Sequence, residues 1–168
     1  MSIKSKASSE QLFKEVMGSY PSGVTVITTM DQQQNPIGLT ANSFVSVSID
    51  PLLVLWCIDK KANSYKVFGA ADKFAVNILS ADQKDACWTF ASKTEPDRFA
   101  KHEWKLSENG LPLIDEVFAS MECKKVQEVD AGDHYILIGE VLDIHKADKE
   151  PMLYFRRNVG AVPADFSV

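Results

Sequence analysis

The 168 residues are enough for one domain with its own hydrophobic core, and their composition, 45% hydrophobic and 24% charged, is typical of a globular protein. The formal net charge of −5 argues against a nucleic-acid-binding protein, because a phosphate backbone is bound by clustered lysine and arginine. No apolar run approaches the roughly 20 residues that cross a bilayer, so we expect no membrane-spanning segment.

The cysteines and the first residues indicate a cytoplasmic protein. Residues 1–10 are polar and lack the apolar core of a secretory signal. The three cysteines, Cys57, Cys87 and Cys123, are odd in number and widely spaced, which is typical of reduced thiols rather than of a disulfide framework.

The first predicted elements are a helix and a hairpin. A helix is expected over residues 8–18, because its apolar side chains recur at helical spacing: Leu12, Phe13, Val16 and Met17. A turn at 20–23 precedes a β-branched run at 24–29, which predicts a strand. The polar connection at 31–36 then predicts a hairpin with the stretch that follows it.

Residues 38–49 are uncharged and rich in small hydroxyl and amide side chains. From Val45 the stretch alternates apolar residues with serines, which is the period of a strand. We expect Val45, Val47 and Ile49 to be buried in the core and the serines to form a polar face. A flat polar ligand can approach the backbone closely on such a face. The alternative is an edge strand with a solvated serine face.

The remaining elements are strands and two further helices. The apolar run at 52–58 predicts a strand buried on both faces. A helix is expected from Asn63 or Ser64 to residue 70, and another from the capping-box sequence at 80–83 to residue 92. Further strands are predicted over residues 74–79, 119–126, 134–145 and 152–155, with an irregular segment at 94–109 and turns at 109–110 and 130–133.

Strands that follow one another through turns or single helices favour an antiparallel β-barrel over a doubly wound α/β sheet. We therefore predict a mainly β fold with a few peripheral helices. A single domain is expected over residues 1–168, with flexible or irregular tails at 1–8 and 160–168.

The motifs of several enzyme classes are missing. The glycines form neither the GxGxxG fingerprint nor a P-loop. The three histidines do not have metal-ligand spacing, and no GxSxG nucleophile elbow occurs. If the chain is an enzyme, its chemistry therefore belongs to a bound organic cofactor that the protein positions.

Three features are candidate binding groups. Asn63 and Ser64 precede a helix, whose N-terminus attracts phosphate; plain N-capping is the alternative. His134 follows a turn and can hydrogen-bond a ligand at the mouth of a pocket, or it is an ordinary surface residue. Arg98 and Phe99 offer a guanidinium for phosphate and an aromatic lid, or a solvated charge and a core aromatic.

Six short motifs occur in one order, and together they resemble the flavin reductase-like domain, the small reductase component of two-component flavin-dependent monooxygenases. The resemblance covers residues 13–155. The motifs are residues 20–26, 38–44, 46–51, 74–79, 122–123 and 132–134.

This resemblance implies an FMN-binding split barrel, antiparallel and Greek-key-like, that is normally a homodimer. It implies that NADH or NADPH reduces FMN or FAD, and that the reduced flavin serves a separate monooxygenase. His134 is expected to position the nicotinamide, with Tyr154 and Arg156 contacting the same nucleotide. The flavin contacts that it implies are Thr40, Ala41, Asn42, Ser43, Ser46, the backbone of Val47, Cys57, Asn63, Ser64, Arg98 and Phe99.

The chain departs from the family pattern in its last strand. The family often continues there with glycine and an aromatic residue, whereas this sequence reads Arg156-Arg157-Asn158-Val159-Gly160.

The resulting hypothesis is an NAD(P)H:flavin oxidoreductase. Hydride passes directly from nicotinamide to flavin, so the missing nucleophile and metal motifs are consistent with it. Three alternatives stay open: a non-catalytic FMN-binding electron-transfer flavoprotein on the same barrel, an oxidase or reductase acting on a pyridoxal or cobalamin species, and a flavin-free interaction module. The sequence does not choose between FMN and FAD, or between NADH and NADPH.

Overall fold

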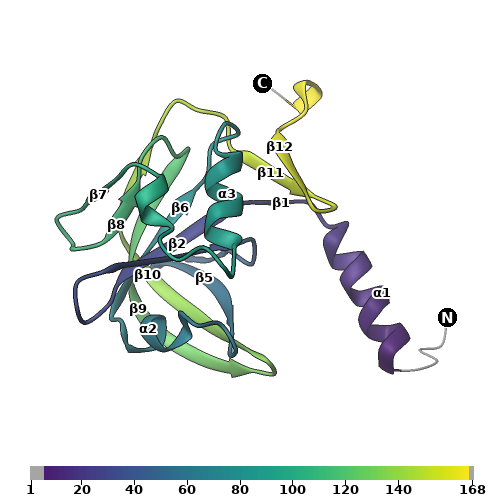
Figure 1. Cartoon of the computed structure of the whole chain (residues 1–168), viewed down its shortest axis with the longest axis horizontal. Helices are drawn as coiled ribbons and strands as arrows, with labels where there is room; N and C mark the ends of the chain where they lie inside the picture. Colours follow the sequence, from purple (N-terminus) through teal and green to yellow (C-terminus); the bar gives the residue numbers. More distant parts are fainter. Residues whose placement is uncertain (1–5, 167–168) are drawn as a thin grey trace.

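Seven antiparallel strands form the main sheet of the protein, which is shown in a computed structural model that describes residues 6–166 (Figure 1). Their order across the sheet is β3-β2-β6-β9-β10-β5-β4. The strands are β2 (Thr25–Met30), β3 (Pro36–Ala41), β4 (Val45–Ile49), β5 (Leu52–Asp59), β6 (Lys73–Ile78), β9 (Ala119–Ala131) and β10 (His134–Lys146).

The main sheet is curled into a split barrel. β3 and β4 lie at its opposite edges, yet only residues 42–44 connect them. The step from Ala41 to Val45 spans at most about 14 Å of extended chain, so the sheet must curl until its two edges approach each other. No strand pairing joins β3 to β4 within the part of the chain that the structure describes, and the barrel therefore stays open along this line.

Smaller elements surround the barrel. A second sheet has the order β1-β11-β12, and β7 pairs with β8. Helix α1 projects from the body beside the second sheet, whereas α3 lies against the barrel (Figure 1). These elements are α1 (Lys6–Gly18), β1 (Ser22–Gly23), α2 (Tyr65–Ala70), α3 (Lys84–Ala91), β7 (Trp104–Leu106), β8 (Pro112–Ile114), β11 (Met152–Phe155), β12 (Asn158–Ala161) and two 3₁₀ turns, Phe99–Lys101 and Ala164–Phe166.

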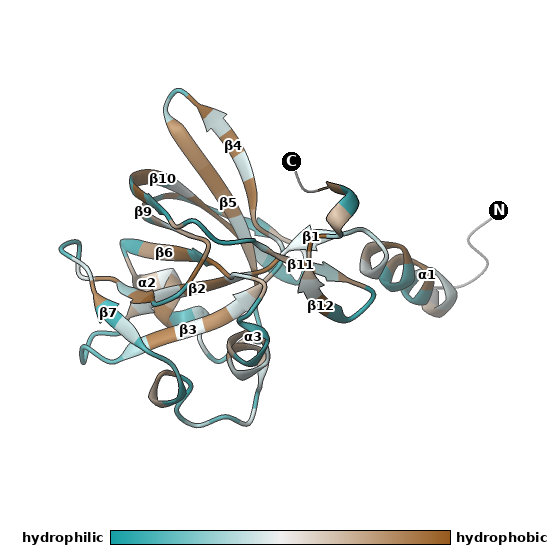
Figure 2. Ribbon diagram, turned by 90° about the horizontal axis from the view of Figure 1, so that it is seen from above, coloured by the Kyte–Doolittle hydropathy of each residue, from teal (hydrophilic) through white to brown (hydrophobic). Residues whose placement is uncertain are grey.

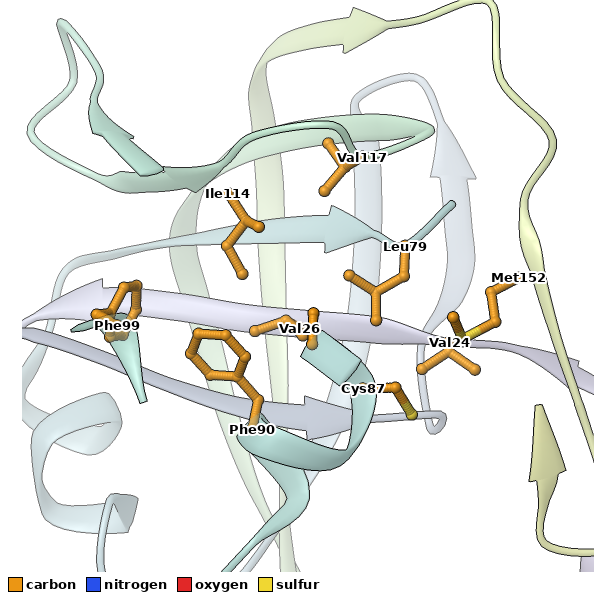
Figure 3. Packing of buried hydrophobic residues seen from close by; sticks show 10 residues of the cluster. Val24, Val26, Leu79, Cys87, Phe90, Phe99, Ile114, Val117 and Met152 are labelled. Carbon is orange, nitrogen blue, oxygen red and sulfur yellow. The ribbon is translucent and has the colours of Figure 1, made fainter. Parts of the chain in front are cut away.

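Two hydrophobic clusters stabilise this arrangement. Inside the barrel, the ring of Trp56 meets Phe68 and Phe74 edge-on, with centroids 5.0 and 5.9 Å apart. The second cluster lies under α3, where Phe90 and Cys87 belong to one group of buried side chains with Val24, Val26 and Leu79 (Figure 3). α3 is thereby fixed against β2 and β3, next to the line where the barrel is split.

The predicted mainly β, antiparallel barrel class is confirmed. Every strand expected from the sequence is present, although several ends differ, and β9 continues to Ala131 rather than stopping at residue 126. β1 and β7 lie in segments that the sequence indicated as turns or irregular structure, and β8 lies in a segment to which no element was assigned. None of the helices over residues 6–166 is long and apolar enough to cross a membrane.

The three predicted helices are present, but their starts differ. α3 begins at Lys84 because residues 80–83 form a turn instead of the first helical turn. The Ser80 N–H donates to the Gln83 side chain at 3.0 Å, which is one half of a capping box. The Ser80 hydroxyl donates to the Glu116 carbonyl at 2.9 Å, so the other half is missing.

The predicted tails are partly regular. Residues 6–8 belong to α1, and residues 160 and 161 belong to β12. Residues 1–5 and 167–168 lie outside the described residues.

The expected burial of β4 is wrong. Val45, Val47 and Ile49 are 51%, 47% and 88% exposed. β4 is an edge strand whose only partner within residues 6–166 is β5, and the β4–β5 hairpin extends away from the barrel (Figure 2). Its alternation therefore marks a strand, but neither of its faces reaches the core.

The expectation that β5 is buried on both faces is also wrong. Val54, Trp56 and Ile58 are buried in the barrel, whereas Leu55 and Cys57, on the other face, are half-buried. No element covers that outer face within residues 6–166.

Candidate functional site

The outer face of β5 and β10 brings together three of the residues that the sequence singled out. His134 is paired with Asp59, and Ile136 is paired with Cys57. Side chains that are directly opposite in an antiparallel pair share a face, and diagonal neighbours are about 7–8 Å apart. His134 and Cys57 are such diagonal neighbours, so they lie close together on the same face of the sheet.

Ser43 joins this face from the segment that links β3 to β4. Its Oγ accepts a hydrogen bond from the Cys57 N–H at 2.9 Å and lies 3.3 Å from the Cys57 carbonyl, to which it can donate. Both residues are half-buried. The split of the barrel is therefore fastened to the middle of β5 at the place where a flavin contact was predicted.

Asn42 and Ala41 differ in what they offer a ligand. The Asn42 side chain is exposed and makes no hydrogen bond to the described residues, so its amide is free to donate and accept. Ala41 is 8% exposed, and its carbonyl already accepts a 2.6 Å hydrogen bond from the Thr25 hydroxyl. Ala41 can therefore offer a ligand mainly the small part of its surface that is exposed.

Ser46 and Val47 lie on the exposed edge strand. Ser46 is exposed and pairs with Val54, whereas Val47 falls at a shift of register between Ser46 and Ser48 and has no partner in β5. A residue without a ladder partner keeps its backbone groups available. This agrees with a backbone contact at Val47, which remains a prediction.

Thr40, in β3, and Arg98, from the segment after α3, both form hydrogen bonds on the side of β3 that faces α3. The Thr40 hydroxyl donates to the Cys87 carbonyl at 2.7 Å, and Nη1 of Arg98 donates to the Gly38 carbonyl at 2.6 Å. A Cβ at Gly38 would lie 2.9 Å from the Phe90 ring, so only glycine permits this close packing of α3 on β3. α3 and Arg98 hold β3, and hence the residues that follow it, in place.

Arg98 and Phe99 are adjacent in the sequence but differ in their contacts: Arg98 forms hydrogen bonds, and Phe99 packs in the core. The second Nη group of Arg98 donates to the Ser92 carbonyl, and burial lowers the pKa of its guanidinium from the ordinary value. Phe99 is 6% exposed and packs edge-on against Phe90 and Trp104. The interpretation of Phe99 as an aromatic lid is therefore wrong, because its ring belongs to the core.

The Ser64 hydroxyl, at the N-terminus of α2, does not cap the helix. Ser64 is the N-cap residue, but its side chain makes no capping hydrogen bond, and the adjacent Asn63 is exposed. Lys60 comes shortly before them in the chain, but its Nζ donates to Asp130 at 2.6 Å and lies 4.7 Å from the centre of the Tyr135 ring. The phosphate position expected from the sequence therefore offers Asn63 and Ser64, and the charge of Lys60 is held elsewhere.

His134 is oriented by its neighbour in the sequence. Its Nδ1 lies 2.7 Å from Oδ1 of Asp133, where an ionised carboxylate accepts the hydrogen bond. This hydrogen bond lowers the pKa of the Asp133 carboxyl from its ordinary value. Since the His134 side chain is 42% exposed and its Nε2 has no hydrogen-bond partner in residues 6–166, Nε2 is available to a ligand.

Tyr154 lies in β11 of the second sheet and Arg156 in the turn that follows it, apart from the face that holds His134. Tyr154 is half-buried and paired with Ser22, and Nε of Arg156 donates to the Ser19 hydroxyl at 3.2 Å. No contact between either residue and His134 occurs in the described chain. The contacts with the nicotinamide nucleotide that were expected of Tyr154 and Arg156 therefore stay predictions.

Sequence reasoning missed the apolar half of the outer face. Leu55, Ile136 and Ile138 are half-buried and line the sheet beside Cys57, because Leu55 pairs with Ile138 and Cys57 with Ile136. Each lies in a predicted strand, but the register that groups them joins segments about 80 residues apart. These residues can be found only from the strand register, which shows that they are paired on the same uncovered face of β5 and β10.

Comparison with known proteins agrees with this architecture. The model of the family described as "Flavin reductase like domain" matches residues 17–163. The chain therefore belongs to the flavin reductase-like family, and the resemblance recognised in its motifs is confirmed.

The relatives are named as reductases. The chain is 46% identical over 143 residues to the reductase component of a flavin-dependent trigonelline monooxygenase from Acinetobacter baylyi, covering 85% of this chain and 46% of that protein. It is 39% identical over 155 residues to a flavin reductase from Pseudomonas putida, covering 92% and 91%. The chain spans only about half the length of several curated relatives that it matches.

A solved structure shows the same fold over the whole chain. This relative is an NADH:FAD oxidoreductase from Streptomyces globisporus in complex with NAD and FAD fragments. The TM-score is 0.89 and the identity 36%, covering 99% of this chain and all of that one. The split-barrel fold is thus shared with this relative.

Proposed function

We propose that this domain is an NAD(P)H:flavin oxidoreductase that reduces FMN or FAD and delivers the reduced flavin to a separate monooxygenase. One observation carries the proposal: Ser43 and His134 flank Cys57 on the outer face of a flavin reductase-like barrel, a face that no element covers within residues 6–166. The relatives named as a monooxygenase reductase component and as an NADH:FAD oxidoreductase support it.

The residues on this face suit a flat, amphipathic ring system. Leu55, Ile136 and Ile138 offer an apolar wall, while Asn42 supplies a free amide at its edge. The Ser64 hydroxyl has no capping hydrogen bond, which fits a phosphate at the end of β5. The residues present therefore fit a flavin, whose ring, when bound, accepts hydride from the nicotinamide.

The chain itself binds and orients the two ligands. Ser43 fastens the split of the barrel to β5 and so keeps the Asn42 amide next to the apolar wall. His134, with Nδ1 held by Asp133, presents Nε2 to the nicotinamide carboxamide. Tyr154 and Arg156 contact the rest of the nicotinamide nucleotide, and Thr40 and Arg98 act on the flavin by holding β3.

The protein also functions as a homodimer in this proposal. The apolar stripe of α1 and the apolar side chains of β4 are exposed, and they are too many for a typical monomer surface. A second copy buries both sets and covers the outer face beside the site. Three free cysteines in the described chain support a reducing, cytoplasmic location.

The test is dinucleotide oxidation by the purified chain, followed through the loss of nicotinamide absorbance. It is run with NADH and with NADPH, each with FMN and with FAD. Flavin-dependent turnover in at least one combination is expected. Tight flavin binding without turnover in any of them would show the non-catalytic flavoprotein instead, and no flavin binding would show an interaction module.

A further inference from the structure

His102 keeps one ring nitrogen in the protein interior without a partner. Its Nε2 is buried and forms no hydrogen bond within residues 6–166. Buried polar atoms in proteins are nearly all paired, and one that is left unpaired lowers stability, so such an atom calls for an explanation. His102 follows the 3₁₀ turn Phe99–Lys101, on the side of the barrel that carries α3, and it has no role in the proposed reaction.

The ring of His102 packs on the residue that fixes α3 to the barrel. Its centroid lies 5.6 Å from that of Phe90, with the ring planes 34° apart. Phe90 is 1% exposed, and its ring lies only 2.9 Å from the position of a Cβ built at Gly38 in β3. On the same helix the Cys87 carbonyl accepts the Thr40 hydroxyl at 2.7 Å. The position of the imidazole therefore bears on how closely α3 packs against β3.

His102 also borders a hollow of about 570 Å³ beside α3. The charged residues that line this hollow are Asp82, Asp85 and Lys101. Lys101 is paired with Glu95, whereas neither aspartate forms an ion pair or a side-chain hydrogen bond in the part of the chain that the structure describes. A positively charged ring that turned into the hollow would thus meet unpaired carboxylates.

The buried Nε2 suits only the neutral imidazole. A neutral ring can keep its proton on Nδ1 and leave just a lone pair at Nε2. A protonated ring would bury a charged N–H group without an acceptor, which costs much more than a buried lone pair. Burial accordingly lowers the pKa of His102 from its ordinary value; Asp85 opposes this shift, and Lys101 adds to it.

We propose that His102 is a pH-sensitive latch between α3 and β3. When it is neutral, its ring packs on Phe90 and α3 stays closed on β3. When it is protonated, the ring turns into the hollow, where the Asp85 carboxylate accepts its N–H, and Phe90 loses a ring that covers it. α3 then packs less closely on β3, and the adjoining residues 40–43 bind flavin more weakly; this last step rests on the proposed function.

The latch predicts a loss of stability in mild acid. Because the pKa of His102 is lower in the folded protein than in the unfolded chain, the stability that the neutral ring contributes is complete above the ordinary value of 6.5 and is lost as the pH falls below it. Between pH 8 and pH 5.5 the melting temperature of the wild type should fall by at least about 2 °C more than that of His102→Gln.

His145→Gln is the matched control, because it removes an exposed imidazole in β10. Its melting temperature should fall with pH as that of the wild type does. Equal falls in the wild type and in His102→Gln overturn the proposal.

A histidine titration by NMR tests the movement of the ring in the wild type itself. The Cε1 proton of His102 should report a pKa below the ordinary value, and the ring protons of Phe90 should shift with the same midpoint. Asp85→Asn should lower that midpoint further, because the carboxylate favours the charged ring. Phe90 signals that stay constant through the titration overturn the latch.

The effect on flavin is measured separately, by titration with FMN and with FAD at both pH values. From pH 8 to pH 5.5 the flavin Kd of the wild type should rise at least about twofold more than that of His102→Gln. Equal rises overturn the link between the latch and the flavin. If no flavin binds at either pH, the proposed function fails, and the melting and NMR experiments still decide on the latch.

Discussion

At the scale of single residues, His134 presents one ring nitrogen outward because Asp133 holds the other. We predict that His134→Ala raises the KM for the nicotinamide dinucleotide about tenfold, the cost of one hydrogen bond to a polar ligand. The flavin Kd should change by less than twofold, since Ser43 and Asn42 remain. Steady-state kinetics and flavin titration measure the two effects.

Asp133→Asn is the companion variant, because it keeps the size of the side chain and removes its charge. It should raise the same KM by a smaller factor, through poorer orientation of the imidazole. An unchanged KM in His134→Ala would remove this histidine from the site.

Cys57 provides a chemical probe of the outer face. It is half-buried beside Ser43, and burial raises the pKa of its thiol, but burial is deeper at the other two cysteines, where it raises the pKa of Cys87 to about 11 and that of Cys123 to about 12. Because the thiolate is the reactive form, we predict that an alkylating reagent modifies Cys57 first in the native protein. Bound flavin should slow this reaction at least about fivefold at 80% occupancy or more, by simple exclusion.

The measurement is peptide mass spectrometry with and without saturating FMN or FAD. Cys123 serves as the internal control, since it is 0% exposed and should react only on unfolding. Equal rates of Cys57 modification with and without a flavin that binds would place the flavin elsewhere.

At the scale of elements, Gly139 shows how closely β10 approaches the barrel core. A Cβ there would lie 2.5 Å from the Phe74 ring and 2.8 Å from the Cys123 Cβ. We predict that Gly139→Ala lowers the free energy of unfolding by about 1–3 kcal/mol, the usual cost of overpacking a core. Denaturant unfolding measures it.

Gly160→Ala is the matched substitution, since a Cβ built at Gly160 in β12 has no neighbouring atom within 4 Å among the described residues. It should change the unfolding free energy by less than about 0.5 kcal/mol. Equal effects of the two substitutions would contradict the packing argument.

The elements also show what local pattern predicts. β10 and the helix at residues 8–18 were predictable, because their periodicity and turn signals are local. β12 was not, because Asn158–Ala161 is short and small and is held by pairing with β11 through a strained turn. The burial of β4 was mispredicted for a related reason: an alternating pattern does not reveal whether a strand has one neighbour or two.

The site residues also fall into two groups: those that the sequence indicated and those that only the fold reveals. The nearness of Ser43, Cys57 and His134 depends on strand register between distant segments, which no local pattern contains. The family resemblance pointed to these residues, whereas the apolar wall at Leu55 and Ile136 and the core position of Phe99 needed the fold itself. The roles of the predicted ligand contacts stay predictions.

At the scale of the whole molecule, the exposed apolar surface of α1 and β4 predicts a homodimer. Ile49 is 88% exposed at the end of β4, on a hairpin that extends from the barrel (Figure 2). In a two-fold dimer each substitution is present in both copies, so its effect on the dissociation free energy is doubled. Burial of an isoleucine contributes about 1.5–3 kcal/mol, so Ile49→Lys should raise the dimer dissociation constant about a hundredfold or more.

Light scattering after size-exclusion chromatography measures the molar mass across a concentration series, and circular dichroism checks that the variant is folded. Leu106→Lys is the matched control, because Leu106 is 55% exposed in β7, away from α1 and β4 (Figure 2). It should leave the mass unchanged. A wild type that elutes as a monomer at all concentrations would contradict the dimer, and an Ile49→Lys variant as dimeric as the wild type would move the interface off β4. Loss of flavin affinity together with dimerisation would show that the second copy completes the outer face, because that face has no cover within residues 6–166.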